Sequence, residues 1–260
     1  MKIYTITCHN VYNHGAILQA YALMTYLQQQ GHEVEIIDYQ PSYLNNHYKL
    51  FRIDHPRWNK NWLWRLIYLM VKLPGRIWGL KRKIAFDRFR EKYLVLTKDC
   101  YSSNTELKKR LPKADVYICG SDQIWNSTFP NGRDPAFYLD FAPKEKRKLS
   151  YAASFATDYI PEEIVPFVKE KLCYLDHISV REQSGVSLVR QLKIGNVKHV
   201  VDPTFLLSKE HWNNLARSMK EPKKKYILVY DFDHSPILKN IAMEIAYKTG
   251  YSINSVNPNK

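Results

Sequence analysis

Polar side chains cluster after an apolar segment in the middle of the chain, where they could bind a ligand. Val116–Cys119 is apolar, and the residues that follow it are Gly120, Ser121, Asp122, Gln123, Ile124, Trp125 and Asn126. Glycine accepts backbone angles closed to other residues, and the polar side chains offer hydrogen-bond donors and acceptors. So many polar groups beside a buried strand cost free energy unless something binds them. The pattern therefore predicts a binding site at Gly120–Asn126.

A second candidate is the pair Arg181–Glu182, which directly follows the expected strand His177–Val180. A guanidinium group is a planar fork that can hold a carboxylate or a phosphate through two hydrogen bonds. Arg181 could equally form a surface ion pair with a neighbouring acid, and exposed pairs of this kind contribute little to stability. The residues alone leave both interpretations open.

A third candidate is the polar loop that precedes the first expected helix. Ile3–Thr7 is expected to be a strand, and apolar residues repeat at helical spacing from Ile17 until Gly31. Asn13, His14 and Gly15 therefore lie at a helix N-terminus, where free N–H groups favour an anion. The loop lacks the Gly-x-Gly-x-x-Gly pattern of dinucleotide sites, and ordinary loop and capping chemistry is the alternative.

The candidates belong to a regular alternation of strands and helices. Helices are expected at about 161–174 and at Ser184–Leu192, the second capped by Ser184. The expected strands are Ile3–Thr7, Val34–Asp38, Val116–Cys119, Lys148–Ala152, His177–Val180 and Val197–Val201. This alternation predicts an α/β protein with a doubly wound parallel sheet, whose strands all end at one edge.

Residues 41–112 interrupt the alternation with a basic insertion. They hold seventeen Lys/Arg against five Asp/Glu, a difference of +12 in a chain of net charge +14. Within them an apolar, tryptophan-rich segment runs from Trp58 to Val71, is interrupted by Arg65 and is closed by Lys72, Pro74 and Gly75. It is too short to cross a bilayer, which takes about 20 apolar residues. A helix packed on its own domain with a solvated cationic face is the first interpretation. Peripheral contact with a membrane surface through residues 58–78 is the second, because tryptophan flanked by cations suits that surface. Nucleic-acid binding is ranked last, because no nucleic-acid motif accompanies the charge.

Composition indicates a cytoplasmic protein. Lys2 is followed by a short strand rather than by the long apolar stretch of a signal peptide. The four cysteines show no disulfide or CxxC pattern and are interpreted as small core residues. The nine histidines are scattered without ligand spacing, so no metal site is expected.

Four segments carry a family resemblance: Gly120–Asn126, Ser150–Phe155, Ser179–Glu182 and Val201–Leu206. In this order, each at a strand end, they resemble the signatures of the polysaccharide pyruvyl transferase family over most of residues 1–206. The resemblance implies a Rossmann-like domain in a glycosyltransferase-B-like architecture. It also implies transfer of pyruvyl from phosphoenolpyruvate to a saccharide, free or lipid-linked, as a ketal during surface or exopolysaccharide synthesis.

The resemblance also implies roles for particular residues. Arg181 would hold the donor, and Asp122 would act as a base or anchor an acceptor hydroxyl. The substrate-binding set would be Asn13, His14, Gly15, Gly120, Ser121, Gln123, Asn126, Ser154 and Glu182. Neither a metal nor a cofactor beyond the donor is expected.

The expected domains are residues 1–217, a charged linker at 218–225 and the start of a second Rossmann-like domain at 226–260. The family's second half carries an Arg-x-His type segment near the donor that finds no match after Lys225, so we expect a fragment or a truncated relative. A nucleotide-sugar glycosyltransferase and a non-catalytic, membrane-associated saccharide-binding module remain alternatives.

Overall fold

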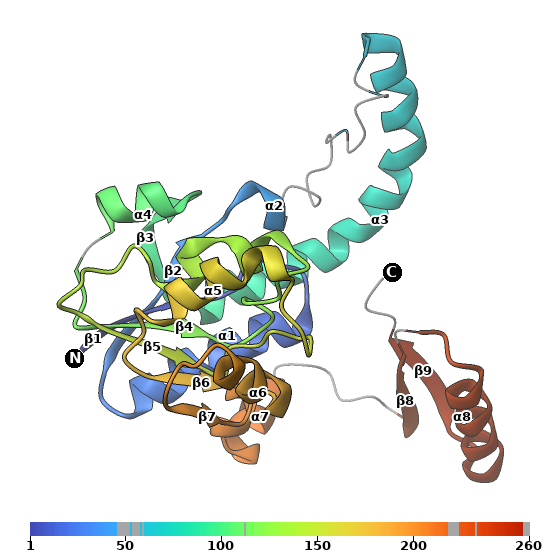
Figure 1. Ribbon diagram of the computed structural model, residues 1–260. Helices are drawn as coiled ribbons and strands as arrows, with labels where there is room; N and C mark the ends of the chain where they lie inside the picture. Colours follow the sequence, from blue (N-terminus) through green and yellow to red (C-terminus); the bar gives the residue numbers. More distant parts are fainter. Residues whose placement is uncertain are drawn as a thin grey trace. The chain divides into compact units, whose positions relative to one another are not determined.

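The computed structural model divides into two compact units, Met1–Leu207 and Ser208–Lys260 (Figure 1). It describes residues 1–45, 53, 58, 60–111, 113–217, 224–231 and 233–256. Most of the expected linker at 218–225, and parts of the expected insertion at 41–112, lie outside the described residues.

The first unit is built on a five-stranded parallel sheet with the strand order β3-β2-β1-β4-β5. The strands are β1 (Lys2–Ile6), β2 (Glu33–Tyr39), β3 (Leu96–Tyr101), β4 (Val116–Gly120) and β5 (Arg147–Tyr151). In the centre Ile3 pairs with Val116 and Ile6 with Cys119, and all five residues of β4 are buried. Such a continuously apolar strand is typical of a parallel sheet covered on both faces.

Two further parallel strands continue the sheet beyond β5. β6 (Ile178–Val180) pairs with β7 (Val197–His199), and single bridges join Leu149 to His177 and Ala153 to Val180. The chain thus builds outward from β1 in one direction through β2 and β3 and in the other through β4 to β7. This is the doubly wound, Rossmann-like order that the alternation predicts, which confirms the expected fold class.

Helices connect the strands of the first unit. They are α1 (His14–Gln29), α2 (Ser42–Asn45), α3 (Trp62–Tyr93), α4 (Asn104–Arg110), α5 (Val165–Leu172) and α6 (Gln183–Gln191), with short 3-10 turns η3 (Pro130–Arg133), η4 (Pro135–Tyr138), η5 (Glu162–Ile164) and η6 (Pro203–Leu206). The core between these layers contains large buried aromatic side chains from the strands and from the segment after β4.

The basic segment differs from its expected form in two ways. Residues 96–110 form β3 and α4 instead of part of the insertion. The sequence pattern does not reveal β3, because the middle residues of this edge strand are polar and exposed. The apolar segment expected to end near Pro74 belongs to α3, a continuous helix of 32 residues. A proline inside a helix removes one helical hydrogen bond and tends to kink or break the helix, but α3 continues past Pro74 to Tyr93.

Several local expectations also need correction. α1 begins at His14, so His14 and Gly15 are helical residues and not part of the loop. α6 is preceded by Glu182 as its N-cap without a side-chain bond, so Ser184 is not the cap. All four cysteines are free, as expected, but only Cys8 and Cys119 are buried; Cys100 and Cys173 are exposed.

The second unit contains α7 (Lys209–Ala216), β8 (Tyr226–Tyr230), α8 (Pro236–Thr249) and β9 (Ser252–Val256). Ser208 caps α7, accepting a hydrogen bond from the N–H of His211. β8 and β9 pair in parallel, and the side chains of β8 alternate between exposed and half-buried. Most of the large apolar side chains of α8 are exposed, including Ile237 and Tyr247.

Candidate active site

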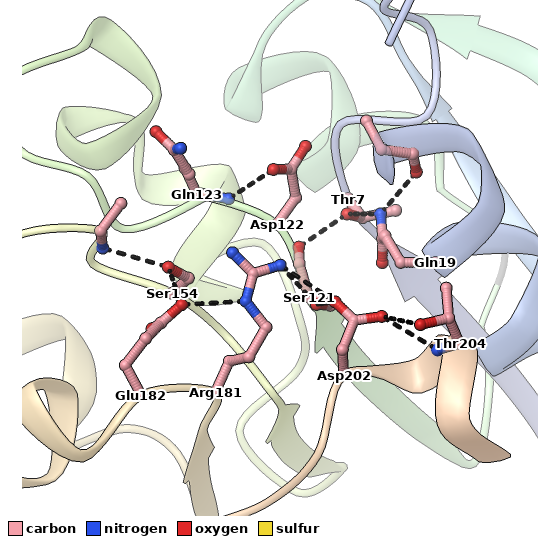
Figure 2. A network of polar contacts seen from close by, with 12 residues as sticks. Thr7, Gln19, Ser121, Asp122, Gln123, Ser154, Arg181, Glu182, Asp202 and Thr204 are labelled. Atoms are coloured by element: carbon pink, nitrogen blue, oxygen red, sulfur yellow. Dashed lines mark hydrogen bonds and ion pairs between the residues drawn. The ribbon is translucent and has the colours of Figure 1, made fainter. Parts of the chain in front are cut away.

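The parallel strands of the first unit end at one edge, and polar residues from five of them gather there (Figure 2). Thr7 follows β1, Ser121 and Asp122 follow β4, and Ser154 lies just beyond β5. Arg181 and Glu182 follow β6, and Asp202 follows β7. The expected crevice at the carboxyl ends of the strands is therefore lined by side chains far apart in the sequence.

Arg181 is the centre of this network. Its Nε donates to Glu182 Oε1 at 2.9 Å, and its Nη1 donates to Asp202 Oδ2 at 3.0 Å and to Ser121 Oγ at 3.4 Å. Burial opposes the charge, but Glu182 and then Asp202 raise the pKa of Arg181 overall. Arg181 is thus an ion-paired residue in a half-buried crevice, not the exposed surface pair that the alternative interpretation describes.

One edge of the guanidinium remains available to a ligand. Nη2 of Arg181 makes no hydrogen bond within the described part of the chain, and Figure 2 shows it pointing to the side of Asp122 and Gln123. The surrounding charge nevertheless opposes an anion, because Asp122, Glu182 and Asp202 contribute three carboxylates against one guanidinium. An anionic ligand at Nη2 would need further cations from outside this network.

Asp122 has an unusual backbone and a perturbed carboxyl group. Its φ is 71°, in the left-handed region that residues with a side chain seldom adopt, and strain of this kind concentrates at functional sites. Its Oδ1 accepts a hydrogen bond from the N–H of Gln123 at 2.8 Å. Burial raises the pKa of Asp122, Gln123 and Arg181 oppose the rise, and Asp202 and Glu182 add to it. A carboxylate held in this way is well suited to accept a proton.

Gly120 serves a different purpose from the one expected. Its φ is not positive, so the conformational freedom of glycine is used at Asp122 and not here. An added Cβ at Gly120 would lie 3.0 Å from Cδ2 of Leu23, so the residue is small because α1 packs closely over β4.

The segment after Asp122 is braced by buried residues. Trp125 stacks on Tyr138 with ring centroids 5.6 Å apart, and its Nε1 donates to the carbonyl of Phe137 at 3.0 Å. Asn126 is buried; its amide donates to Gln123 Oε1 at 3.0 Å, and its Oδ1 accepts from the hydroxyl of Thr128. Asn126 thus positions Gln123, whose own side chain is exposed.

Ser154 connects two parts of the crevice. It is fully buried, its Oγ donates to Glu182 Oε1 at 2.8 Å, and the N–H of Ala156 donates to that Oγ at 3.0 Å. Its N–H donates to the carbonyl of Asp122 at 3.1 Å. Ser154 therefore positions Glu182 and Asp122 and has no free polar atom for a substrate. Ser121 is likewise buried, between Arg181 and Asp202.

Asn13, His14 and Gly15 lie at the start of α1 and are exposed. Asn13 caps the helix, because its Oδ1 accepts from the N–H of Ala16 at 3.2 Å. The ring of His14 packs on Phe86 of α3, 4.9 Å between centroids, and burial and then Arg82 lower its pKa. Within the described residues, none of the three makes a hydrogen bond or an ion pair with the Arg181 network.

Four members of the network were missed as site residues: Thr7, Gln19, Asp202 and Thr204 (Figure 2). Gln19 of α1 donates to Thr7 Oγ1, and Thr7 donates to the carbonyl of Ser121, both at 2.9 Å. Asp202 accepts from the N–H and hydroxyl of Thr204 with its second oxygen. Asp202 could have been found from its place at a strand end; nothing in the local pattern singles out Gln19.

A model of the polysaccharide pyruvyl transferase family matches residues 13–259, which is nearly the whole chain. The chain belongs to this family. The match extends beyond the four resembling segments through the second unit, so the family assignment covers both units. Membership of this family identifies the protein as a transferase, and the crevice around Arg181 is its candidate active site.

Two further comparisons were made. No curated protein matches the chain. Among solved structures, an α-glucosyltransferase in complex with UDP and a 13-mer DNA containing an HMU base is similar at a TM-score of 0.41 and 10% identity, covering 99% of this chain and 67% of that one.

Proposed function

We propose that this member of the pyruvyl transferase family transfers the pyruvyl group of phosphoenolpyruvate to two hydroxyls of a saccharide. A proton adds to the methylene carbon of the donor, and one acceptor hydroxyl attacks the neighbouring carbon. Phosphate then leaves, the second hydroxyl attacks the same carbon, and a ketal with a new methyl group results. Of the two hydroxyl protons released, one balances the proton gained by carbon and the other leaves with phosphate.

Arg181 and Asp122 are the residues to which we assign this chemistry. Nη2 of Arg181, the edge free of hydrogen bonds in the described part of the chain, would donate to the carboxylate or phosphate of the donor. Asp122 would accept a hydroxyl proton, since burial has raised its pKa and one of its oxygens is not engaged by Gln123. Gln123 and Glu182 would orient the acceptor.

The observation that carries the proposal is the placement of an ion-paired guanidinium beside a carboxyl of raised pKa in a family of pyruvyl transferases. The balance of three carboxylates to one guanidinium means that the donor's second anionic group must be met by cations elsewhere in the protein. We propose that the acceptor belongs to a surface polysaccharide, free or lipid-linked, and that transfer occurs on the cytoplasmic side of the membrane without a further cofactor.

Calorimetric titration of the chain with phosphoenolpyruvate, and separately with UDP-glucose, tests the donor. We expect heat of binding with phosphoenolpyruvate and none with UDP-glucose. The Arg181→Ala variant should lose this heat of binding. Arg190→Ala, which changes an exposed arginine on α6, is the matched control and should keep it. Binding of UDP-glucose instead would assign the crevice to a nucleotide-sugar glycosyltransferase. Binding of an oligosaccharide but of neither donor would indicate a non-catalytic saccharide-binding module.

A further inference from the structure

The long helix α3 carries a regular apolar stripe. Its members are Leu63, Leu66, Met70, Leu73, Ile77, Leu80 and Ile84, spaced alternately by three and four residues. In a helix this spacing places all seven side chains on one face, and the stripe spans about 33 Å at 1.5 Å per residue. Met70 is 60% and Ile77 50% exposed. Leu63, Leu66 and Ile84 are also exposed, and Leu73 and Leu80 are partly buried.

The opposite face of α3 attaches the helix to the first unit. Arg82 Nη2 donates to the carbonyl of Tyr12 at 2.7 Å, and Phe86 packs on Tyr12 and His14. One turn further on, Phe89 and Tyr93 pack on the ring of Tyr21. At 100° per residue these attachment positions lie on the opposite side of the helix from the stripe. The apolar stripe therefore faces away from the domain that holds α3.

The residues around the stripe are strongly cationic. Between residues 55 and 86 the sequence contains no Asp or Glu, and residues 60–84 contain seven cations: Lys60, Arg65, Lys72, Arg76, Lys81, Arg82 and Lys83. Lys60, Arg65, Lys72 and Lys81 are exposed. Trp62, at the start of the helix, is 75% exposed.

From this geometry we infer that α3 lies with its stripe on the surface of an anionic lipid bilayer. An interfacial helix buries its apolar face at the boundary between headgroups and acyl chains, and its cations contact the anionic headgroups. The helix rests on the surface instead of crossing it: no described helix of this chain is long and apolar enough to span a membrane. This inference does not depend on the proposed chemistry of the crevice.

A second copy of the chain is a poorer occupant of the same stripe. In a coiled coil the positions that flank the seam face each other, and here Arg76, Lys81, Lys83 and Arg88 occupy them. Lys83 is paired with Asp87 of its own helix, but Arg76, Lys81 and Arg88 would meet like charges in such a dimer, and residues 55–86 contain no acid to offset them. An anionic surface complements the same cations.

Sedimentation of the full chain with lipid vesicles tests the inference. We expect binding to phosphatidylcholine vesicles that contain about 30% phosphatidylglycerol, weak binding to pure phosphatidylcholine, and release at about 1 M salt, where the Debye length is about 3 Å. Equal binding to both vesicles, or no sedimentation with anionic vesicles at low salt, would overturn the inference.

Paired variants separate the stripe from general surface effects. The double change Leu66→Gln, Met70→Gln should weaken binding about tenfold or more, while Ile237→Gln, Met243→Gln on α8 should leave it unchanged. The double variant Lys72→Gln, Lys81→Gln should weaken binding to anionic vesicles about 25-fold, at about fivefold for each cation. The control double variant Lys109→Gln, Lys239→Gln, which removes exposed cations elsewhere, should leave this binding unchanged.

Three other measurements would contradict the inference. If Leu66→Gln, Met70→Gln lowers the melting temperature by several degrees, the stripe is packed inside the protein in solution. If equilibrium sedimentation shows a dimer that this change converts to a monomer, a second copy covers the stripe. Binding to a DNA duplex as tight as that to anionic vesicles, and equally sensitive to the stripe variants, would assign the face to nucleic acid.

Discussion

The crevice and the outward stripe of α3 both carry charge, but they hold it in opposite ways. In the crevice Arg181 is half-buried and bonded to Glu182 and Asp202 at 2.9 and 3.0 Å. On α3 the exposed cations stand along an apolar face with no acid in the surrounding 32 residues, 55–86. Ion pairs in a partly buried site hold their side chains in a fixed orientation. Exposed charges of one sign attract an oppositely charged partner together, and salt screens that attraction. The first arrangement suits the positioning of a substrate, and the second suits attraction to a surface.

Tryptophan side chains give the largest expected contrast between the two regions. Trp125 is fully buried beneath the crevice, so Trp125→Ala should cost about 3–5 kcal/mol of the free energy of unfolding. Trp62 on α3 is 75% exposed, and Trp62→Ala should change that free energy by about 0.5 kcal/mol or less. Chemical denaturation followed by circular dichroism measures both. Similar costs for the two variants would mean that α3 is packed as firmly as the crevice.

Asp122 gives the next largest effect, and it concerns activity. Asp122→Asn keeps the shape of the side chain but cannot accept a proton, so turnover should fall by roughly 10²-fold or more while donor binding stays nearly constant. Release of phosphate from phosphoenolpyruvate in the presence of acceptor measures turnover. Asp99→Asn, an exposed aspartate on β3, is the control. Normal turnover per folded molecule would leave Asp122 with only a bracing role.

Arg181 tests whether the crevice depends on geometry or only on charge. Arg181→Lys keeps the charge and loses the fork, so affinity for phosphoenolpyruvate should fall by about 1.5–3 kcal/mol. Arg190→Lys on α6 should have no effect. On α3, by contrast, Lys and Arg should be interchangeable for binding anionic vesicles. Unchanged donor affinity in Arg181→Lys would remove Arg181 from the donor site.

The smallest expected effect is the pH dependence of stability at Asp122. Burial raises the pKa of this carboxyl above its usual 3.8, so ionising it costs stability in the folded state. That cost is absent below pH 3.8 and fully present above the raised pKa. Asp122→Asn should therefore be more stable than the parent chain at neutral pH, and the advantage should vanish in acid. Denaturation at both pH values checks the sign; lower stability of the variant at pH 7 would contradict it.

The alternation of the sequence predicts most of the sheet, because buried parallel strands such as β4 are continuous apolar segments flanked by polar loops. It fails at β3, where an edge strand exposes its polar middle and resembles a loop. It also fails along α3, where Pro74 and Gly75 suggest an end but the helix continues to Tyr93 and is attached to the domain at Phe86 and Tyr93. Local propensity is a weak guide wherever the domain supplies the stabilising contacts.

The candidate site is predictable in part. Strand ends select Asp122, Arg181 and Glu182, and these are the accessible members of the network. The same rule also selects Ser121, Asn126 and Ser154, which are buried and hold other residues in place. The sequence cannot separate the two groups, since burial depends on neighbours distant along the chain. Gln19 lies on a helix and reaches the network only because α1 packs over β4.

The span of the crevice along the chain has a consequence for the order of folding. Thr7 and Ser121 are 114 residues apart in sequence, Ser121 and Asp202 are 81 apart, and Arg181 and Ser121 are 60 apart. Contacts of this kind form late, because long loops must close before the contacts can repay the entropy. A nascent or partly folded chain would hold the separate strands without the crevice. A ligand of the crevice should thus bind only molecules that have finished folding, and it should slow their unfolding as its concentration rises.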